Sequence, residues 1–110
     1  MILRRLRLHW NRARLSSLSD RIATRSQHAV WQRVRQRVTS MSSHQAQGYI
    51  RVRAASVIER EVGIAVAEEP DVDAHYWPFI VQAVRRRVVR RALADAVRLR
   101  AAQNASRRVA

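Results

Sequence analysis

The sequence predicts an all-α protein with three or four helices in an extended or hairpin arrangement. The 110 residues include only two Gly, two Pro and six aromatic side chains, which is little turn and strand material for a sandwich, barrel or propeller. A hydrophobic share of 47% is too high for a disordered basic tail. The apolar residues recur at intervals of three and four, as they do on one face of a helix. A chain of this length forms one small domain.

The first part of the chain, residues 1–62, is predicted to be a basic helical arm with helices at about 3–15, 20–40 and 45–62. Three apolar stripes with helical spacing follow one another at its start: Leu3, Leu6, Trp10 and Ala13, then Leu15, Leu18 and Ile22, then Trp31, Val34, Val38 and Met41. The middle stripe points elsewhere than the other two, so one straight helix cannot bury all three against one partner. Ser17 and Asp20 have capping-box spacing and predict a break there, unless the two helices fuse into one bent rod.

Ser42 and Gln45 repeat the capping-box spacing and predict the start of the helix at 45–62. Its buried side would consist of four apolar residues: Ile50, Ala54, Val57 and Ile58. Gly63 stands where a left-handed C-cap residue is favoured. Residues 63–77 are then predicted to form an acidic connector loop.

The last part, residues 78–110, is predicted to be an Arg-rich helix with a frayed tail after Asn104. Pro78 suits the first helical position, where its missing N–H is not needed. Seven apolar residues fall within an arc of about 120° on a helical wheel: Val81, Val84, Val88, Ala92, Ala96, Leu99 and Ala102. Five arginines fill another arc of about 140°: Arg86, Arg87, Arg90, Arg91 and Arg98. We expect partner subunits to complete the core that these stripes begin.

Arginine accounts for all 22 basic residues, against eight acids, and the net charge is +14. Guanidinium groups gathered on one helical face repel one another by up to about 1 kcal/mol for each close pair in water. An external polyanion relieves this repulsion, and Arg binds phosphate through two parallel hydrogen bonds. The alternative is a solvated basic face that acids of the same chain partly neutralise, although pairing every acid still leaves 14 arginines unpaired.

These features favour a small non-catalytic structural subunit of a large intracellular assembly, which binds RNA phosphates, with a mitochondrial ribosome as the first expectation. The five arginines of the last helix would contact RNA, and five N-terminal arginines would add to the contact: Arg4, Arg5, Arg7, Arg12 and Arg14. The first alternative is a supernumerary subunit of a mitochondrial respiratory or ATP synthase membrane complex, contacting cardiolipin or acidic subunits. The second is a bacterial or phage DNA-binding protein.

Five aromatic residues are predicted to dock partner subunits: Trp10, Trp31, Tyr76, Trp77 and Phe79. Trp10 and Trp31 lie on apolar stripes, which favours packing over base stacking. The cluster at residues 75–79 lies at a loop-to-helix junction and is more typical of a hydrophobic staple or a docking anchor than of a platform for bases.

The first 58 residues carry 12 Arg, one acid and eight Ser. This composition is typical of a mitochondrial targeting segment, and equally of a mature basic helix from a GC-rich genome. We therefore expect the mitochondrial matrix or a matrix-facing complex, with the bacterial cytoplasm as the alternative. No uncharged run approaches the roughly 20 apolar residues of a membrane span, so any lipid contact would be peripheral.

Catalytic and metal-binding patterns are weak. The chain has no Cys, hence no disulfide, thiolate ligand or thiol nucleophile. Asp71 and Asp73 alternate near His75, but the Gly and Glu positions of a calcium loop are missing. The two glycines do not form a phosphate-binding loop. We expect no enzyme activity, no metal and no cofactor.

Overall fold

The computed structural model describes the backbone of residues 2–69 and 72–109, and the side chains of residues 12–69 and 72–108. The described residues form three long α-helices and a short 3₁₀ turn: α1 (Ile2–Val38), α2 (Ser43–Glu68), η1 (Ala74–Tyr76) and α3 (Trp77–Val109). No described residue lies in a strand. The predicted all-α class is confirmed.

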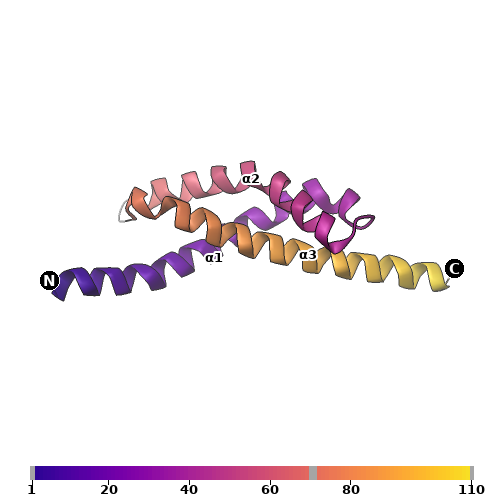
Figure 1. Ribbon diagram of the computed structural model, residues 1–110, viewed down its shortest axis with the longest axis horizontal. Helices are drawn as coiled ribbons and strands as arrows, with labels where there is room; N and C mark the ends of the chain where they lie inside the picture. The colour runs from indigo at the N-terminus through magenta and orange to yellow at the C-terminus, as the bar shows by residue number, and fades with distance from the viewer. Residues whose placement is uncertain (1, 70–71, 110) are drawn as a thin grey trace.

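The three helices form an elongated bundle of 67 × 22 × 22 Å. Helices α1 and α3 run in the same direction, α2 runs opposite to both, and each helix packs against the other two (Figure 1). The beginning of α1 and the end of α3 project from opposite ends of the bundle (Figure 1). Residues 101–108 of the projecting α3 end are all exposed.

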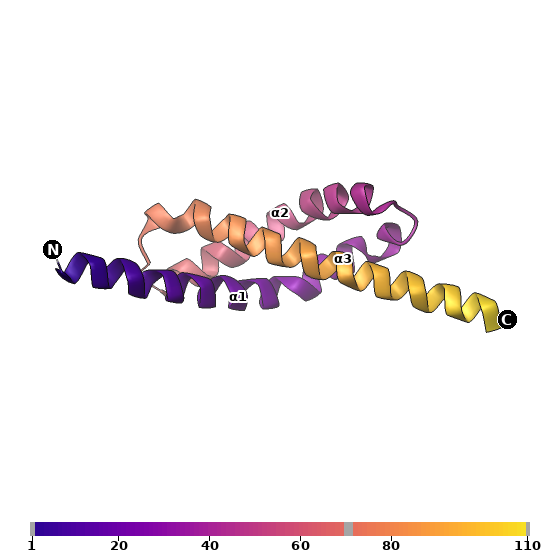
Figure 2. The same ribbon diagram turned by 60° about the horizontal axis from the view of Figure 1, so that its bottom comes forward.

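Each helix buries a stripe of residues spaced by four. The stripes are Leu18, Ile22, Ser26, Val30, Val34 and Val38 on α1, Ala46, Ile50, Ala54, Ile58 and Val62 on α2, and Ile80, Val84, Val88, Ala92 and Ala96 on α3. Because a helix has 3.6 residues per turn, each step of four advances by about 40°, and the stripe winds around the helix. Ridges with this spacing pack at an inclined angle. Figure 2 accordingly shows α2 crossing behind α3.

Two serines lie among these apolar side chains on α1. Ser19 and Ser26 are 2% and 0% exposed. Their hydroxyls donate to the carbonyl oxygens of Leu15 at 2.7 Å and Ile22 at 2.8 Å, so burial leaves neither donor unpaired.

The predicted break near residues 16–20 is wrong and the alternative of fused helices is confirmed, because α1 is continuous from Ile2 to Val38. Its winding stripe is covered by two partners, α2 and α3, instead of one. One helix can bury successive stripes when two partners cover it. Ser17 and Asp20 therefore lie inside a helix and do not cap one.

The start of α2 is confirmed in detail. The Ser42 hydroxyl accepts from the Gln45 amide, and the Gln45 side chain accepts from the Ser42 amide, each at 3.2 Å. All four residues predicted for the buried side of α2 are buried. The predicted end at residue 62 is wrong, since α2 continues to Glu68. Ala65 is buried and Val66 packs against the core, so burial favours another turn and a half of helix.

Gly63 is an interior residue of α2 and has no positive φ. A Cβ built at this position would lie 3.6 Å from Cη2 of Trp77. The predicted C-cap role is therefore wrong, and Gly63 instead faces the edge of the Trp77 side chain.

The connector is shorter than the predicted loop at 63–77. It ends at Asp73, whose carboxylate accepts from the His75 amide at 3.1 Å and caps η1. Pro78 lies in the first turn of α3. The helix extends beyond its predicted limit near residue 104, because α3 continues to Val109, and fraying of this exposed end stays a prediction. Ala, Gln and Arg favour helix, and Arg107 and Arg108 in the last turn complement its dipole.

The described helices nowhere combine the length and apolar character that crossing a bilayer requires. The expectation that partner subunits complete the core stays a prediction. The described part of the chain already buries 19 apolar side chains in one cluster.

We predict that Gly48→Ala and Gly63→Ala each raise the free energy of unfolding by about 0.5–1 kcal/mol. Both glycines are helical without positive φ, a Cβ at Gly48 meets nothing within 4 Å, and the one at Gly63 makes an ordinary contact. Urea denaturation measures the change. As a reference, Ile58→Ala in the core should lower the same quantity by about 2–5 kcal/mol. Destabilisation by either glycine substitution would contradict these helical assignments.

Candidate anion-binding surface

The five arginines of α3 predicted to bind an anion lie opposite its buried stripe or beside it. We call Arg86, Arg87, Arg90, Arg91 and Arg98 the arginine strip. Val84, Val88 and Ala92 are buried on the inner side of α3, at 0–1% exposure. Packing of these three residues fixes the rotation of the helix, and with it the direction in which each arginine leaves the backbone.

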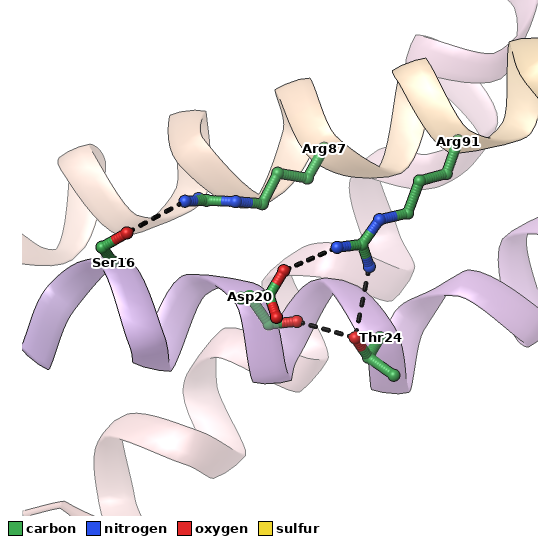
Figure 3. A network of polar contacts seen from close by, with 5 residues as sticks. All are labelled: Ser16, Asp20, Thr24, Arg87 and Arg91. Atoms are coloured by element: carbon green, nitrogen blue, oxygen red, sulfur yellow. Dashed lines mark hydrogen bonds and ion pairs between the residues drawn. The ribbon is translucent and has the colours of Figure 1, made fainter.

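Arg91 reaches across to α1. One of its nitrogens, Nη2, lies 2.6 Å from Oδ1 of Asp20, and Nη1 donates to the Thr24 hydroxyl at 3.2 Å (Figure 3). The Thr24 hydroxyl donates in turn to the Asp20 carbonyl oxygen at 2.9 Å. Asp20 is the one acid in the first 58 residues, and it neutralises an arginine of the strip.

Arg87 also points toward α1, one turn before Arg91 (Figure 3). Its Nη2 donates to the Ser16 hydroxyl at 3.2 Å. This partner is neutral, so the full charge of Arg87 is retained. The remaining guanidinium donors can take an anion, because a guanidinium carries five N–H groups.

Arg98 pairs with Asp95, one turn earlier on the same helix. The second oxygen of Asp95, Oδ2, accepts from Nε2 of Gln27 on α1 at 3.3 Å. Asp95 therefore supports the contact between α1 and α3 as well as neutralising Arg98.

Arg86 and Arg90 are exposed on the outer face of α3. Within the described side chains neither makes an ion pair or a hydrogen bond. They stand one turn apart, with Arg87 on the side nearer α1. These two residues are the part of the strip most open to an external anion.

Two acids at the end of α2 pair elsewhere. Glu69 lies 3.4 Å from Arg21 and Glu68 lies 3.7 Å from Arg25, both arginines being on α1. The possibility that these carboxylates neutralise the strip is not realised. They join α1 to α2 and leave the outer face of α3 positive.

Of the other predicted residues, Arg12 and Phe79 line one groove between α1 and α3, and the rest are dispersed. The side chains of Arg4, Arg5, Arg7 and Trp10 lie outside the described ones. Arg12 is exposed and Arg14 is half-buried. Trp31 and Tyr76 pack against the core, Trp77 lies beside Gly63, and Phe79 is 73% exposed.

The contacts between α1 and α3 were not predicted from the sequence. Ser16, Asp20, Thr24 and Gln27 share the face of α1 that meets α3. Their spacing of three and four residues is a helical signal, but nothing local identifies α3 as the partner. Among the described residues, no three His, Asp or Glu side chains come together as a metal site.

Comparison of the chain with protein-family models, curated proteins and solved structures finds no match.

We predict a weak coupling between Asp20 and Arg91, measured by a double-mutant cycle with Asp20→Asn and Arg91→Gln. The two side chains are 58% and 36% exposed, so water and salt screen the pair, and about 0.2–1 kcal/mol is expected at low salt. The coupling should shrink at 1 M salt. The longer Arg25–Glu68 pair serves as comparison and should couple less. A coupling that salt leaves unchanged would contradict this account.

Proposed function

We propose that the protein is a small non-catalytic structural subunit that binds RNA phosphates through the outer face of α3. The assembly we propose is an intracellular ribonucleoprotein, with a mitochondrial ribosome as the first to examine. One observation carries the proposal: Arg86 and Arg90 are exposed on the outer face of α3 and have no carboxylate among the described residues.

The identity of the basic residues supports phosphate as the ligand. All 22 are Arg, whose planar fork donates two parallel hydrogen bonds to a phosphate. A basic surface that only faces solvent would not require Arg instead of Lys, because Lys carries the same charge. Arg87 is bonded to a neutral hydroxyl beside Arg86 and Arg90. Within two turns of helix there are therefore three guanidinium groups that no carboxylate of the described side chains neutralises.

The length of the basic surface supports a polymer as the partner. Exposed arginines continue along α3 from Arg86 to Arg108, a rise of about 33 Å at 1.5 Å per residue. A single lipid headgroup covers a small part of such a surface, whereas a nucleic-acid backbone presents phosphates along all of it. Glu68 and Glu69 pair with arginines of α1, and Asp95, the partner of Arg98, is the one acid within this stretch of α3.

We predict that Arg86→Gln combined with Arg90→Gln weakens RNA binding more than a control with the same reduction in charge. The control is Arg51→Gln with Arg60→Gln, two exposed residues of α2. Fluorescence anisotropy with a labelled RNA at two salt concentrations measures both variants. The α3 variant should also lower the slope of log affinity against log salt by roughly 0.7–0.9 for each phosphate that it no longer binds.

Wild-type affinity that does not fall with salt would refute the proposal. Equal weakening in the α3 and α2 variants would refute the assignment to α3 and indicate diffuse attraction. Preferential binding to cardiolipin-containing vesicles would favour the membrane-complex alternative, and preferential binding to duplex DNA the DNA-binding one.

A further inference from the structure

A groove opens between α1 and α3, near the beginning of α3. Its volume is about 190 Å³, compared with about 30 and 20 Å³ for two other hollows of the bundle. Eight residues line it: Arg12, Leu15, Ser16, Ser19, Phe79, Ile80, Ala83 and Arg87. No acid is among them, and the groove follows α3 toward the arginine strip.

The inner surface of the groove is apolar. Leu15, Ile80 and Ala83 contribute aliphatic side chains, and Ser19 directs its hydroxyl to the Leu15 carbonyl oxygen. The Ser16 hydroxyl already accepts a hydrogen bond from Arg87. The space therefore suits an uncharged, flat or aliphatic group better than an ion.

Phe79 is the unusual residue of this groove, because it is 73% exposed although it adjoins an apolar surface. Most of its ring faces water, where it gains nothing from the hydrophobic effect. An exposed ring at the edge of an apolar groove is able to stack on a planar ligand.

The charge beside the groove is positive on both helices. Arg12 of α1 is exposed, and Arg87 of α3 carries a charge that its Ser16 partner does not neutralise. Because the two guanidinium groups flank an apolar space, the complementary ligand has a planar apolar part joined to a negative group. A nucleotide of a single strand has this composition, since its base is planar and its phosphate is anionic.

We propose that the groove takes an unpaired base of single-stranded RNA, stacked on Phe79, with the adjoining phosphates on Arg12 and Arg87. This inference rests on the proposed function and names the form of RNA that the surface selects. Stacking on an aromatic side chain is tolerant of base identity, so the groove selects unpaired strands and no particular sequence. Duplex RNA, whose bases are already stacked and paired, would contact the arginines alone.

The test compares Phe79→Ala with Val52→Ala, which removes a 76% exposed apolar side chain from α2. The probes are a labelled oligouridine 12-mer and an RNA duplex, titrated at one salt concentration. Phe79→Ala should weaken binding of the single strand by about 5- to 150-fold, the range for one base stacked on an aromatic ring. Binding of the duplex should not change. Val52→Ala should alter neither, and Phe79→Trp should retain the affinity for the single strand.

The salt dependence separates this inference from the proposed function. Phe79→Ala should keep the wild-type salt slope, because the ring neutralises no phosphate. If Phe79→Ala binds both probes as the wild type does, the base site is refuted while phosphate binding stands. Equal weakening for strand and duplex would refute it too, since the ring would then act on the fold.

Two further outcomes would overturn the inference: no RNA binding at all, or a lipid as the ligand of the groove. A wild-type protein with no affinity for either probe refutes the proposed function and the base site with it. The last measurement is the binding of wild type and Phe79→Ala to vesicles that contain cardiolipin. If wild-type protein binds them and Phe79→Ala does not, while oligouridine binding is unaffected, the groove takes an acyl chain and the base proposal is wrong.

Discussion

The four-residue spacing of the buried stripes is the constraint on which the rest of the structure depends. With Ile80, Val84 and Val88 at 0–1% exposure, α3 has one rotation that keeps all three inside. That rotation turns Ala83, Arg87 and Arg91 toward α1, where the last two find oxygen partners. It turns Arg86 and Arg90 outward. The division of the strip into inward-bonded and outward-facing arginines is therefore a consequence of core packing. A change in the electrostatics alone would not alter it.

Electrostatic repulsion within the strip is smaller than its composition suggests. Asp20 and Asp95 neutralise Arg91 and Arg98, and the Arg86–Arg90 pair at a spacing of four costs about 0.2–0.5 kcal/mol. Burying a single Val, Leu, Ile or Phe side chain contributes about 1.5–3 kcal/mol, so the core outweighs this repulsion easily. Crowding of like charges does not by itself require an external partner. The case for a polyanion depends instead on the geometry of Arg86 and Arg90, the exclusive use of Arg and the length of the exposed basic surface.

The sequence predicted what local chemistry decides. The capping box at Ser42, the buried side of α2 and the early Pro78 of α3 each depend on residues within one or two turns, and all three are present. It failed where tertiary burial overrides a local signal. Capping-box spacing at Ser17 and a glycine at position 63 favour helix ends locally, but the core extends both helices past them. Within the strip, the outward face was predictable from the helical period. The Asp20–Arg91 pair was not, because 71 residues separate the partners.

The same rotation of α3 relates the groove to the strip. Phe79, Ala83 and Arg87 are spaced by four and lie on the side of α3 that borders α1, while Arg86 and Arg90 lie on the adjoining exposed face. From Phe79 to Arg90 the helix rises by about 17 Å. In the proposed complex, a single strand with one base in the groove contacts Arg12 and Arg87 beside it and continues along α3 to Arg86 and Arg90. In the complex that we propose, guanidinium groups bind phosphate and the Phe79 ring binds the base, and α3 contributes to both kinds of interaction beside Arg12 of α1. Removing either kind leaves the other in place, because different side chains provide them.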